Sequence, residues 1–496
     1  MKIKDLCSVL PEYQTLAVDD ITAQLEVSEI VVDSRHTRSR CVFVALRGTA
    51  LDSHQFLEQV CAQNPAVLVV EDTKGIPASF QGLSIRVADT RKALDLLASR
   101  FYGDPSRRLL MFGVTGTNGK TSSTYLLAHI LNSLQLTTGV IGTINHHLLD
   151  QVWETQSTTP GPLEVQQRLS QMLALGAKAA AIEVTSHALA QRRCDSVQFN
   201  TVLFTNLTRD HLDYHKDMQD YFATKQKLFT DLLWQTKKLP AFAVINIDDP
   251  YGRKLRVAGS AAIWTYGQSR EADFRFKIKD ADFAQTQFQL TTPFGEFRGL
   301  LPFCGEHNVY NAVGVIASAA TFGIPVETSI KALRSFTGVP GRLQSVPNKK
   351  NLNLLIDYAH TPDALDNVLR SLSEIRTQYK LQNQIICIFG CGGDRDKGKR
   401  PQMAAIAEKW ADKIIVTSDN PRTEDPGVII HDILEGFTTT KPYTEVDRRK
   451  AIQLGISLAQ SGDVVLIAGK GHETYQQIGV DRISFSDYKV ASEASQ

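Results

Sequence analysis

Short apolar runs rich in β-branched residues alternate with longer stretches of helical spacing along the 496-residue chain. Each run is followed by Gly, Ser, Asp or Thr, residues that commonly end a strand. The runs expected to be buried strands are Ile30–Val32, Val67–Val70, Leu109–Val114, Ala179–Val184, Thr201–Thr205, Ile385–Phe389, Ile414–Val416 and Val464–Ala468. This alternation predicts an α/β protein with parallel sheets, in which ligands bind just beyond the carboxyl ends of the strands.

Two clusters of turn residues interrupt the alternation, at Tyr102–Ser106 and at Gly338–Arg342. A domain size of roughly 150 residues also suggests about three domains. We therefore expect an N-terminal α/β domain over 1–104 and a central domain over 105–337, with a P-loop ATPase-like parallel sheet and flanking helices. A C-terminal Rossmann-like domain is expected over 338–496.

Composition narrows the possible partners. Hydrophobic residues make up 43% and charged residues 22%, and the formal net charge of +1 provides no field that would recruit nucleic acid or an anionic membrane. The seven cysteines lack C-x-x-C spacing, which argues against a disulfide framework and a zinc site. No signal peptide or membrane span is evident, so we expect a cytoplasmic protein, and a monomer.

The first candidate site is a glycine-rich loop, Thr115-Gly116-Thr117-Asn118-Gly119-Lys120-Thr121. It lies between the expected strand Leu109–Val114 and the helical stretch Ser122–Leu134. In such a loop backbone N–H groups converge on phosphate, a lysine reaches the outer phosphates, and a threonine hydroxyl ligates Mg2+. The general P-loop pattern has glycine where this chain has Val114, and the alternative is an ordinary glycine turn. The residues predicted to bind ATP are Gly116, Thr117, Asn118, Gly119, Lys120, Thr121 and Ser122.

Further motifs are spread over all three segments. They are Glu183–His187, Thr205–Asp213, Gly305–Ala312, Asp357–Pro362 and Ala468–Glu473. Together with the shorter loop form G-T-N-G-K-T, they resemble the Mur ligases, ATP-dependent amide-bond-forming enzymes of peptidoglycan synthesis. The resemblance implies a UDP-muramoyl-substrate-binding domain, a central ATP-binding domain and a C-terminal amino-acid-binding domain. It also implies that UDP-N-acetylmuramoyl-L-alanyl-D-glutamate is activated as an acyl phosphate and joined to meso-diaminopimelate.

The catalytic residues that the resemblance implies are Lys120, Glu183, His211 and Lys225. Thr121, Glu183 and His211 would ligate Mg2+, and Lys225 would be carbamylated to help hold a second Mg2+. Glu183 and His211 do follow apolar runs, as residues at the active edge of a sheet should. From the residues alone, His211 reads equally well as the first residue of a helix, and Lys225 as one lysine on a solvated helix face.

Four more ATP contacts come only from the resemblance: Asn311, Arg342, Asp357 and His360. Because Asp357 and His360 come from the third segment, the site would close only when that segment folds over the second. Closure of that kind would exclude water from a hydrolysable acyl phosphate. The alternative for Asp357 is a carboxylate that caps the end of a strand.

The residues implied to bind the UDP-muramoyl-dipeptide belong to two groups. The uridine-contact positions are Val32, Ser34, Thr49, Ala50 and Leu51, and the dipeptide positions are Ser157, Thr158, Thr159, Thr185, Gln191 and Arg193. The Asp33-Ser34-Arg35 sequence is a weak signal, since a capping turn would look similar. Ser157 stands where relatives often have asparagine, which puts that contact in doubt.

The third segment would select the amino acid. The expected strand Gln384–Phe389 runs into Gly390-Cys391-Gly392, but the third glycine of a dinucleotide-binding fingerprint is replaced by Arg395. The resemblance instead implies a diaminopimelate pocket made of Arg395, Asp419, Asn420, Pro421, Arg422, Gly469 and Glu473. Arg422 would pair with the distal carboxylate, which lysine lacks, and Glu473 with the distal ammonium.

Three alternatives remain. An L-lysine-adding homologue would share almost every motif but typically lacks the arginine at position 422. A folylpolyglutamate synthetase-like ligase shares the phosphate loop but should lack the first segment of about 100 residues. A nucleotide-binding switch or transport ATPase would hydrolyse nucleotide without needing an amine.

Overall fold

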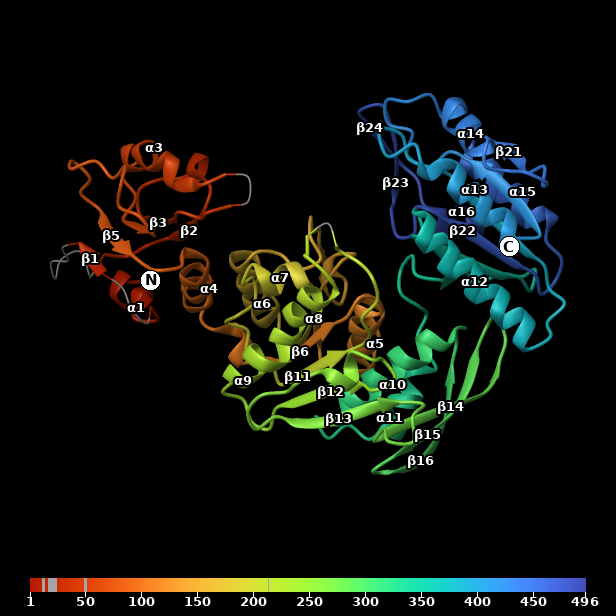
Figure 1. Cartoon of the computed structure of the whole chain (residues 1–496), viewed down its shortest axis with the longest axis horizontal. Coiled ribbons are helices and arrows are strands. Elements are labelled where there is room, and N and C mark those ends of the chain that lie inside the picture. Colours follow the sequence, from red (N-terminus) through yellow and green to blue (C-terminus); the bar gives the residue numbers. More distant parts are fainter. Residues whose placement is uncertain (11–13, 17–24, 49–50, 213) are drawn as a thin grey trace. The chain divides into compact units, whose positions relative to one another are not determined.

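The computed structural model describes residues 1–10, 14–16, 25–48, 51–212 and 214–496. Internal contacts divide the chain into two compact units, Met1–Thr265 and Tyr266–Gln496, and each of them is an α/β structure (Figure 1). The division expected near residues 104 and 337 is finer than this one and stays a prediction. Over the described ranges, no helix is both long enough and apolar enough to span a membrane.

The first sheet of unit Met1–Thr265 has the strand order β1-β5-β4-β3-β2. Its elements are α1 (Ile3–Cys7), β1 (Gln14–Leu16), β2 (Glu29–Val31), β3 (Cys41–Val44), α3 (Leu57–Ala62), β4 (Val67–Val70), β5 (Leu83–Arg86) and α4 (Thr90–Phe101). Successive side chains of a strand point to opposite faces. Val42 and Val44 therefore pack in one cluster with α1 and α4, while Phe43 packs with α3 on the other face.

The second sheet of this unit holds the phosphate loop. Its elements are β6 (Leu110–Thr115), α5 (Lys120–Ser133), β7 (Thr138–Ile141), β8 (His146–Leu148), β9 (Gln151–Trp153), α6 (Pro162–Ala174), β10 (Ala179–Glu183), α7 (Ser186–Ala190), β11 (Thr201–Phe204), α8 (Met218–Lys227), α9 (Leu233–Gln235) and β12 (Phe242–Asn246). Strand β13 (Ala262–Gly267) contains the boundary between the units. Strands β10 and β11 both pair in parallel with β6, so all three carboxyl ends lie at one edge.

The strands around the phosphate loop are parallel, which confirms the expected parallel central sheet, and antiparallel strands extend it. Strands β7, β8 and β9 are consecutive antiparallel neighbours. Only Leu149 and Asp150 connect β8 to β9, and a link this short cannot return the chain in the same direction. The helix expected over Ser122–Leu134 also begins earlier, at Lys120.

Unit Tyr266–Gln496 begins with an antiparallel meander of β14 (Phe274–Ala281), β15 (Thr286–Thr292) and β16 (Gly295–Leu301). Helices α10 (Glu306–Ala320) and α11 (Val326–Leu333) follow it in sequence. The meander is an antiparallel addition that the apolar runs of the sequence do not reveal. Its alternating buried and exposed side chains are typical of an antiparallel sheet with one face covered.

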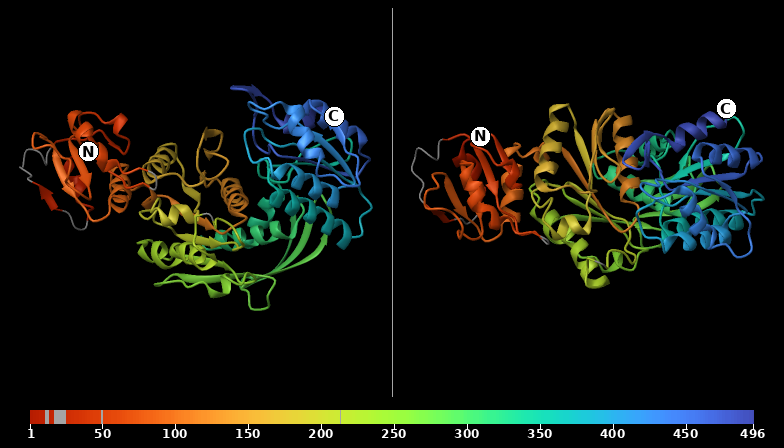
Figure 2. Two further views of the ribbon diagram at one scale, coloured as in Figure 1. Left: turned by 45° about the horizontal axis from the view of Figure 1, so that its top comes forward. Right: turned by 90° about the horizontal axis from the view of Figure 1, so that it is seen from above.

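The last sheet of this unit has the strand order β17-β18-β22-β19-β20-β21, and all pairs except β17–β18 are parallel. The elements of this part of the chain are β17 (Gln344–Ser345), β18 (Asn353–Asp357), α12 (Pro362–Gln378), β19 (Ile385–Phe389), α13 (Lys399–Trp410), β20 (Lys413–Thr417), α14 (Pro426–Leu434), β21 (Tyr443–Glu445), α15 (Arg448–Leu458), β22 (Val464–Ala468), β23 (Tyr475–Ile478), β24 (Asp481–Ser484) and α16 (Asp487–Ala494). Strands β23 and β24 form a separate two-stranded sheet. Helices cover both faces of the sheet, as a doubly wound fold requires (Figure 2). Cys387 packs with α12, α13 and α14, whereas its neighbours Ile386 and Ile388 pack with α15 and α16.

An ion pair without solvent exposure joins two of these helices. Arg448 of α15 donates from Nε to Asp487 Oδ1 (2.8 Å) and from Nη2 to Oδ2 (2.7 Å) of α16, and both side chains are 0% exposed. We predict that Asp487→Asn lowers the free energy of unfolding by about 3–5 kcal/mol, because it leaves a buried guanidinium without its counter-ion.

Glu493→Gln is the matched control, since Glu493 pairs with Arg449 on the same two helices while both side chains stay at least half exposed. Its effect should be under about 1 kcal/mol. Urea unfolding followed by fluorescence measures both variants, and equal losses for the two would contradict the expectation.

Candidate functional site

The phosphate loop joins β6 to α5 and is held by the segment that follows β11. Thr117 N donates to Asn206 O (2.8 Å), and Asn118 N donates to Asn206 Oδ1 (2.9 Å). Lys120 Nζ donates to the carbonyl oxygens of Gly116 (3.0 Å) and Thr117 (2.8 Å). Since two N–H groups of the loop are bonded to Asn206, a phosphate would meet the loop chiefly at the N-terminus of α5.

Glu183 ends β10 beside this loop and is fully buried. Its Oε2 accepts hydrogen bonds from Thr121 Oγ1 (3.0 Å) and Thr143 Oγ1 (2.9 Å), and its Oε1 accepts one from Thr143 N (2.9 Å). Thr121 and Glu183 are therefore in contact. Thr143 was not foreseen, although it is a polar residue shortly after the apolar strand β7, which is the signal that could have revealed it.

Lys225 is buried, contrary to the solvated helix face that its sequence suggests. Its side chain is 1% exposed, and its Nζ donates to Gly116 O (2.9 Å) and lies 4.8 Å from the ring centroid of Tyr221. Burial holds the pKa of this amine well below its usual range, and the positive charge of Lys120 lowers it further. The lowered pKa favours the neutral, nucleophilic form of the amine.

His211 follows β11 but does not begin a helix, so the structure contradicts that alternative. It has a positive φ of 52°, and its side chain is 40% exposed. Its ring centroid lies 5.0 Å from that of His187 and 5.9 Å from that of Tyr221. The structure thus places it in an aromatic cluster at the same strand edge as Lys225.

The side chains around Glu183 decide whether the expected Mg2+ would fit here. In the part of the chain that the structure describes, no cluster of three or more His, Cys, Asp and Glu side chains could hold a metal ion. Glu183, however, is a buried carboxylate whose hydrogen bonds come only from hydroxyl and amide groups. Its oxygens and the hydroxyl of Thr121 are the donors that Mg2+ prefers, so these two residues fit the ion.

The residues expected to hold the dipeptide form one hydrogen-bonded network beside Glu183. Thr159 Oγ1 donates to Glu183 O (2.6 Å) and lies 3.2 Å from Thr185 Oγ1. Arg193 donates to Thr159 O (2.6 Å) and to Gln191 Oε1 (2.9 Å). Three separate stretches of the sequence are thereby brought to the end of β10.

Thr158 extends this network toward the phosphate loop, whereas Ser157 makes a local contact. Thr158 Oγ1 lies 3.1 Å from Thr143 Oγ1, which also contacts Glu183. Ser157, whose role was in doubt, accepts through its carbonyl oxygen from Thr155 Oγ1 (2.7 Å).

Three of the expected uridine-contact residues, Val32, Ser34 and Leu51, are described, and they lie in loops that follow strands of the first sheet of unit Met1–Thr265. Val32 follows β2, and Ser34 opens a short 3-10 turn in which Asp33 accepts a hydrogen bond from Arg35 N (3.0 Å). The capping turn considered as the alternative is therefore present. Leu51 is 56% exposed, and Thr49 and Ala50 lie outside the described residues.

The expected ATP contacts of the third segment lie near the end of β18. Asp357 is buried and accepts from Leu343 N (2.8 Å) and Ala359 N (2.9 Å), so it does cap the strand end. Burial raises its pKa, and the nearby Arg342 opposes that shift. His360 is exposed and binds Tyr358 O through Nδ1 (2.8 Å). Asn311 is buried in α10.

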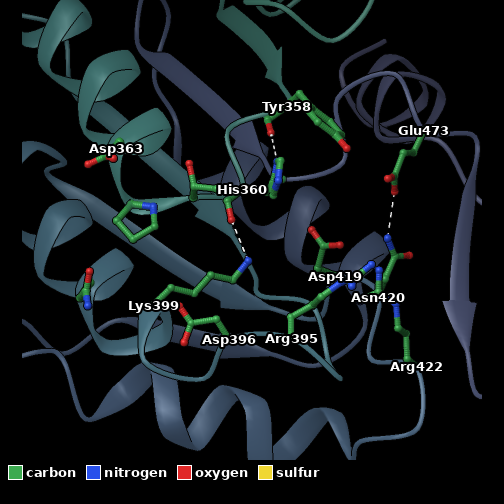
Figure 3. Close-up of a pocket in the computed structure, with 15 residues that line it drawn as sticks. Tyr358, His360, Asp363, Arg395, Asp396, Lys399, Asp419, Asn420, Arg422 and Glu473 are labelled. Atoms are coloured by element: carbon green, nitrogen blue, oxygen red, sulfur yellow. Dashed lines mark hydrogen bonds between the residues drawn. The ribbon is translucent and has the colours of Figure 1, made fainter. Parts of the chain in front are cut away.

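A pocket of about 550 Å³ lies beyond the carboxyl ends of β18, β19, β20 and β22 (Figure 3). Its lining contains the expected residues Arg395, Asp419, Asn420, Arg422, Gly469 and Glu473, together with Tyr358, His360, Thr361, Pro362, Asp363, Gly392, Asp396, Lys399 and Gln402. Pro421 is buried but does not line the pocket. Lys399 was not foreseen, and Figure 3 shows its ammonium donating to His360 O (3.0 Å).

The buried carboxylate of Asp419 has incomplete hydrogen bonding in this pocket. Its Oδ2 is buried without a hydrogen-bond partner, and burial raises its pKa while Arg448 and Lys470 oppose the shift. Gly469, at φ +118°, faces this oxygen so closely that an added Cβ would lie 2.4 Å from it. A ligand ammonium would supply the missing donor to Asp419.

Glu473, which is expected to pair with a ligand ammonium, already has two hydrogen-bond partners within the protein. Its Oε2 accepts from Lys470 Nζ (2.9 Å) and from Asn420 Nδ2 (2.9 Å). Lys470 was not foreseen, although it lies inside the Ala468–Glu473 motif. A buried lysine among pocket residues is a signal that only the fold reveals.

Comparisons with known proteins agree in pointing to one family. The Mur ligase middle domain matches residues 114–319, and the Mur ligase, glutamate ligase domain matches residues 341–471. The UDP-N-acetylmuramoyl-L-alanyl-D-glutamate--2,6-diaminopimelate ligase of Geobacter sulfurreducens is 39% identical over 509 residues, which cover 99% of this chain and 98% of that protein.

Solved structures give the same picture. A structure of a UDP-N-acetylmuramoyl-L-alanyl-D-glutamate--2,6-diaminopimelate ligase matches with a TM-score of 0.74 and 30% identity, covering 100% of this chain and 99% of that one. The folylpolyglutamate synthase of Mycobacterium tuberculosis, complexed with ADP and AMPPCP, matches with a TM-score of 0.58 and 17% identity, covering 80% and 92%. That second likeness is one of fold alone.

The phosphate loop can be tested at Gly116, which has a φ of +150° and where an added Cβ would lie 1.9 Å from Thr205 Oγ1 and 3.0 Å from Asn206 O. We predict that Gly116→Ala displaces the loop and weakens ATP binding at least tenfold, or about 1.4 kcal/mol. Calorimetric titration measures the affinity. Gly161→Ala is the control because nothing lies within 4 Å of its Cβ position, and unchanged affinity in Gly116→Ala would refute the role of the loop.

Proposed function

The chain belongs to the Mur ligase family, and we propose on that premise that it joins meso-diaminopimelate to UDP-N-acetylmuramoyl-L-alanyl-D-glutamate in an ATP-dependent reaction. Identity to a ligase of that name over nearly the whole chain supports the assignment. Arg422 carries the choice of amino acid, because it lines a pocket that also contains the buried carboxylate of Asp419. Diaminopimelate has a second carboxylate for that arginine, and lysine has none.

The reaction proceeds in two balanced steps. The substrate carboxylate attacks the γ-phosphorus of ATP, which forms an acyl phosphate and releases ADP. The amine of the amino acid then attacks the acyl carbon, and inorganic phosphate leaves as the amide forms. Charge stabilisation and positioning provide most of the catalysis of phosphoryl transfer.

We assign the first step to the edge formed by β6, β10 and β11. Lys120 and the N-terminus of α5 would bind the phosphates of ATP, while Thr121, Glu183 and His211 would hold Mg2+. When bound, Mg2+ supplies positive charge between the phosphates and the attacking carboxylate. The network of Thr158, Thr159, Thr185, Gln191 and Arg193 lies beside Glu183, and so it would hold the dipeptide carboxylate near the phosphate loop.

Lys225 would serve as a carbamate that helps hold a second Mg2+. Its buried amine has a strongly lowered pKa, and only the neutral form of an amine adds to CO2. Its contact with Gly116 O places it beside the phosphate loop. The proposed ATP contacts of Asn311, Arg342, Asp357 and His360, and a cytoplasmic location, complete the proposal.

The function is tested by ADP release from the purified enzyme. We predict that release needs both UDP-N-acetylmuramoyl-L-alanyl-D-glutamate and meso-diaminopimelate, and that kcat/KM for diaminopimelate exceeds that for L-lysine by at least about 30-fold, the effect of about 2 kcal/mol. Equal efficiency would favour the lysine-adding alternative. Release that needs no amine would favour the switch or transport ATPase.

The role of Arg422 has a separate prediction. Arg422→Met should lower kcat/KM for diaminopimelate at least about 30-fold and change that for lysine little, because only diaminopimelate loses a charge-assisted contact. Arg449→Met is the control, since Arg449 is half exposed on α15 and pairs with the exposed Glu493. An equal loss for both amino acids would refute selection by Arg422.

The carbamate is tested by its chemistry. Lys225→Ala should lower kcat about 100-fold or more, and short carboxylates such as acetate should restore part of it by replacing the carbamate oxygens. The control is Lys227→Ala, which changes an exposed lysine of the same helix and should keep wild-type activity. Wild-type activity should also fall in CO2-depleted buffer, and full activity of Lys225→Ala without any additive would exclude the carbamate.

A further inference from the structure

Lys470 is a charged side chain enclosed by the protein immediately after β22. Its side chain is 0% exposed, and its Nζ donates to Asn420 Oδ1 (3.0 Å) and Glu473 Oε2 (2.9 Å). The ammonium also lies 5.5 Å from the ring centroid of Tyr475. A charge removed from water is costly unless it is paired, so this lysine needs both polar partners where they are.

Asn420 closes a triangle with these two residues. Its Nδ2 donates to Glu473 Oε2 (2.9 Å), while its Oδ1 also accepts from Gln477 N (2.9 Å). Both ends of the Asn420 amide are therefore committed to the protein. Figure 3 shows the hydrogen bond between Asn420 and Glu473 at one end of the pocket.

Hydrogen bonds with β23 and with Gly479, the residue that follows it, hold Asp419 and Arg422, which flank Asn420 and Pro421. Gln476 Nε2 donates to Asp419 O (2.6 Å), Arg422 N donates to Gln477 O (3.1 Å), and Gly479 N donates to Arg422 O (2.6 Å). Arg422 has a φ of +52°, a left-handed conformation that costs an arginine energy and persists only where the surroundings impose it. The backbone hydrogen bonds of Arg422 with Gln477 and Gly479 impose this left-handed conformation.

We propose that Lys470 is a positioning residue for amino-acid selection: its ammonium locks Asn420 to Glu473 and so fixes the Asp419–Arg422 segment for its ligand. The inference rests on the proposed function, because the ligand is the incoming diamino acid with two carboxylates. Asp419, whose Oδ2 has no hydrogen-bond partner, and Arg422 then line one pocket at fixed separation. An ammonium and a carboxylate of one ligand can meet them together.

A purely structural role for Lys470 predicts a different result. Arg448 and Asp487 form another buried ion pair, 0% exposed on both sides, and breaking either pair costs stability. Lys470 differs because its partner Glu473 lines the pocket. Loss of a merely stabilising pair would lower the amount of folded enzyme, and so the maximal rate, without changing KM, whereas loss of a positioning pair changes the KM of the amino acid and the preference between amino acids.

The test compares Lys470→Met with Gln476→Ala in the full-length enzyme, using ADP release. Gln476→Ala keeps the buried charge and removes the donor to Asp419 O and Ser418 Oγ, so it reports on the same segment even if Lys470→Met does not fold. Lys489→Met, an exposed lysine on α16, is the control. We expect Lys470→Met to raise KM for diaminopimelate about tenfold or more, and Gln476→Ala about fivefold, as for the loss of one hydrogen bond.

The preference for diaminopimelate over lysine should fall by similar factors, while KM for ATP and for the UDP substrate stays within about twofold of wild type. The positioning role is overturned if both variants keep the wild-type KM and preference, or if the KM of all substrates rises equally. If the wild-type enzyme does not respond to diaminopimelate, the proposed function itself fails, and the role of Lys470 falls with it.

Discussion

The phosphate-loop site and the amino-acid pocket both depend on buried charged side chains near the carboxyl ends of parallel strands. Glu183 and Lys470 are 0% exposed, Lys225 is 1% exposed and Asp419 is 7% exposed. Such groups are stable only when hydrogen bonds, opposite charges or a shift in pKa compensate for lost hydration. Here the compensation is incomplete at Glu183, which receives only neutral donors, and at Asp419, which has an oxygen without a partner. We propose that a cation from outside the chain completes each of these two sites.

The strand order determines which charges meet. Because β10 and β11 flank β6 in parallel, Glu183, the glycine loop and Asn206 come from distant parts of the sequence to a single edge. In the last sheet β22 lies between β18 and β19, which places the Ala468–Glu473 motif beside Asp357 and the Gly390–Asp396 loop. One arrangement suits phosphoryl transfer and the other suits recognition of a zwitterion.

Much of this could be predicted from the sequence, because strand ends and glycine turns are local properties. The strands Val67–Val70, Ile385–Phe389 and Val464–Ala468 have the bounds expected from their apolar runs. Most of the residues expected for the amino-acid pocket do line one cavity, while their roles remain predictions. The motif residues were found because they follow strands that are themselves easy to recognise.

What could not be predicted depends on packing between distant segments. Lys225 lies in a polar stretch, and only the packing of α8 on the phosphate loop buries it. Lys470 and Thr143 have no unusual sequence environment, and their importance appears only in their contacts with Asn420, Glu473 and Glu183. The antiparallel strands β8, β9 and β14–β16 carry too short or too mixed a pattern to separate them from a parallel sheet.

A crystal structure of the complex with meso-diaminopimelate tests the central claim most directly. We expect the amino acid in the pocket of about 550 Å³, with one carboxylate on the guanidinium of Arg422 and an ammonium on Asp419 Oδ2. Diaminopimelate bound outside this pocket, or bound within it with Arg422 contacting no carboxylate, would contradict the assignment.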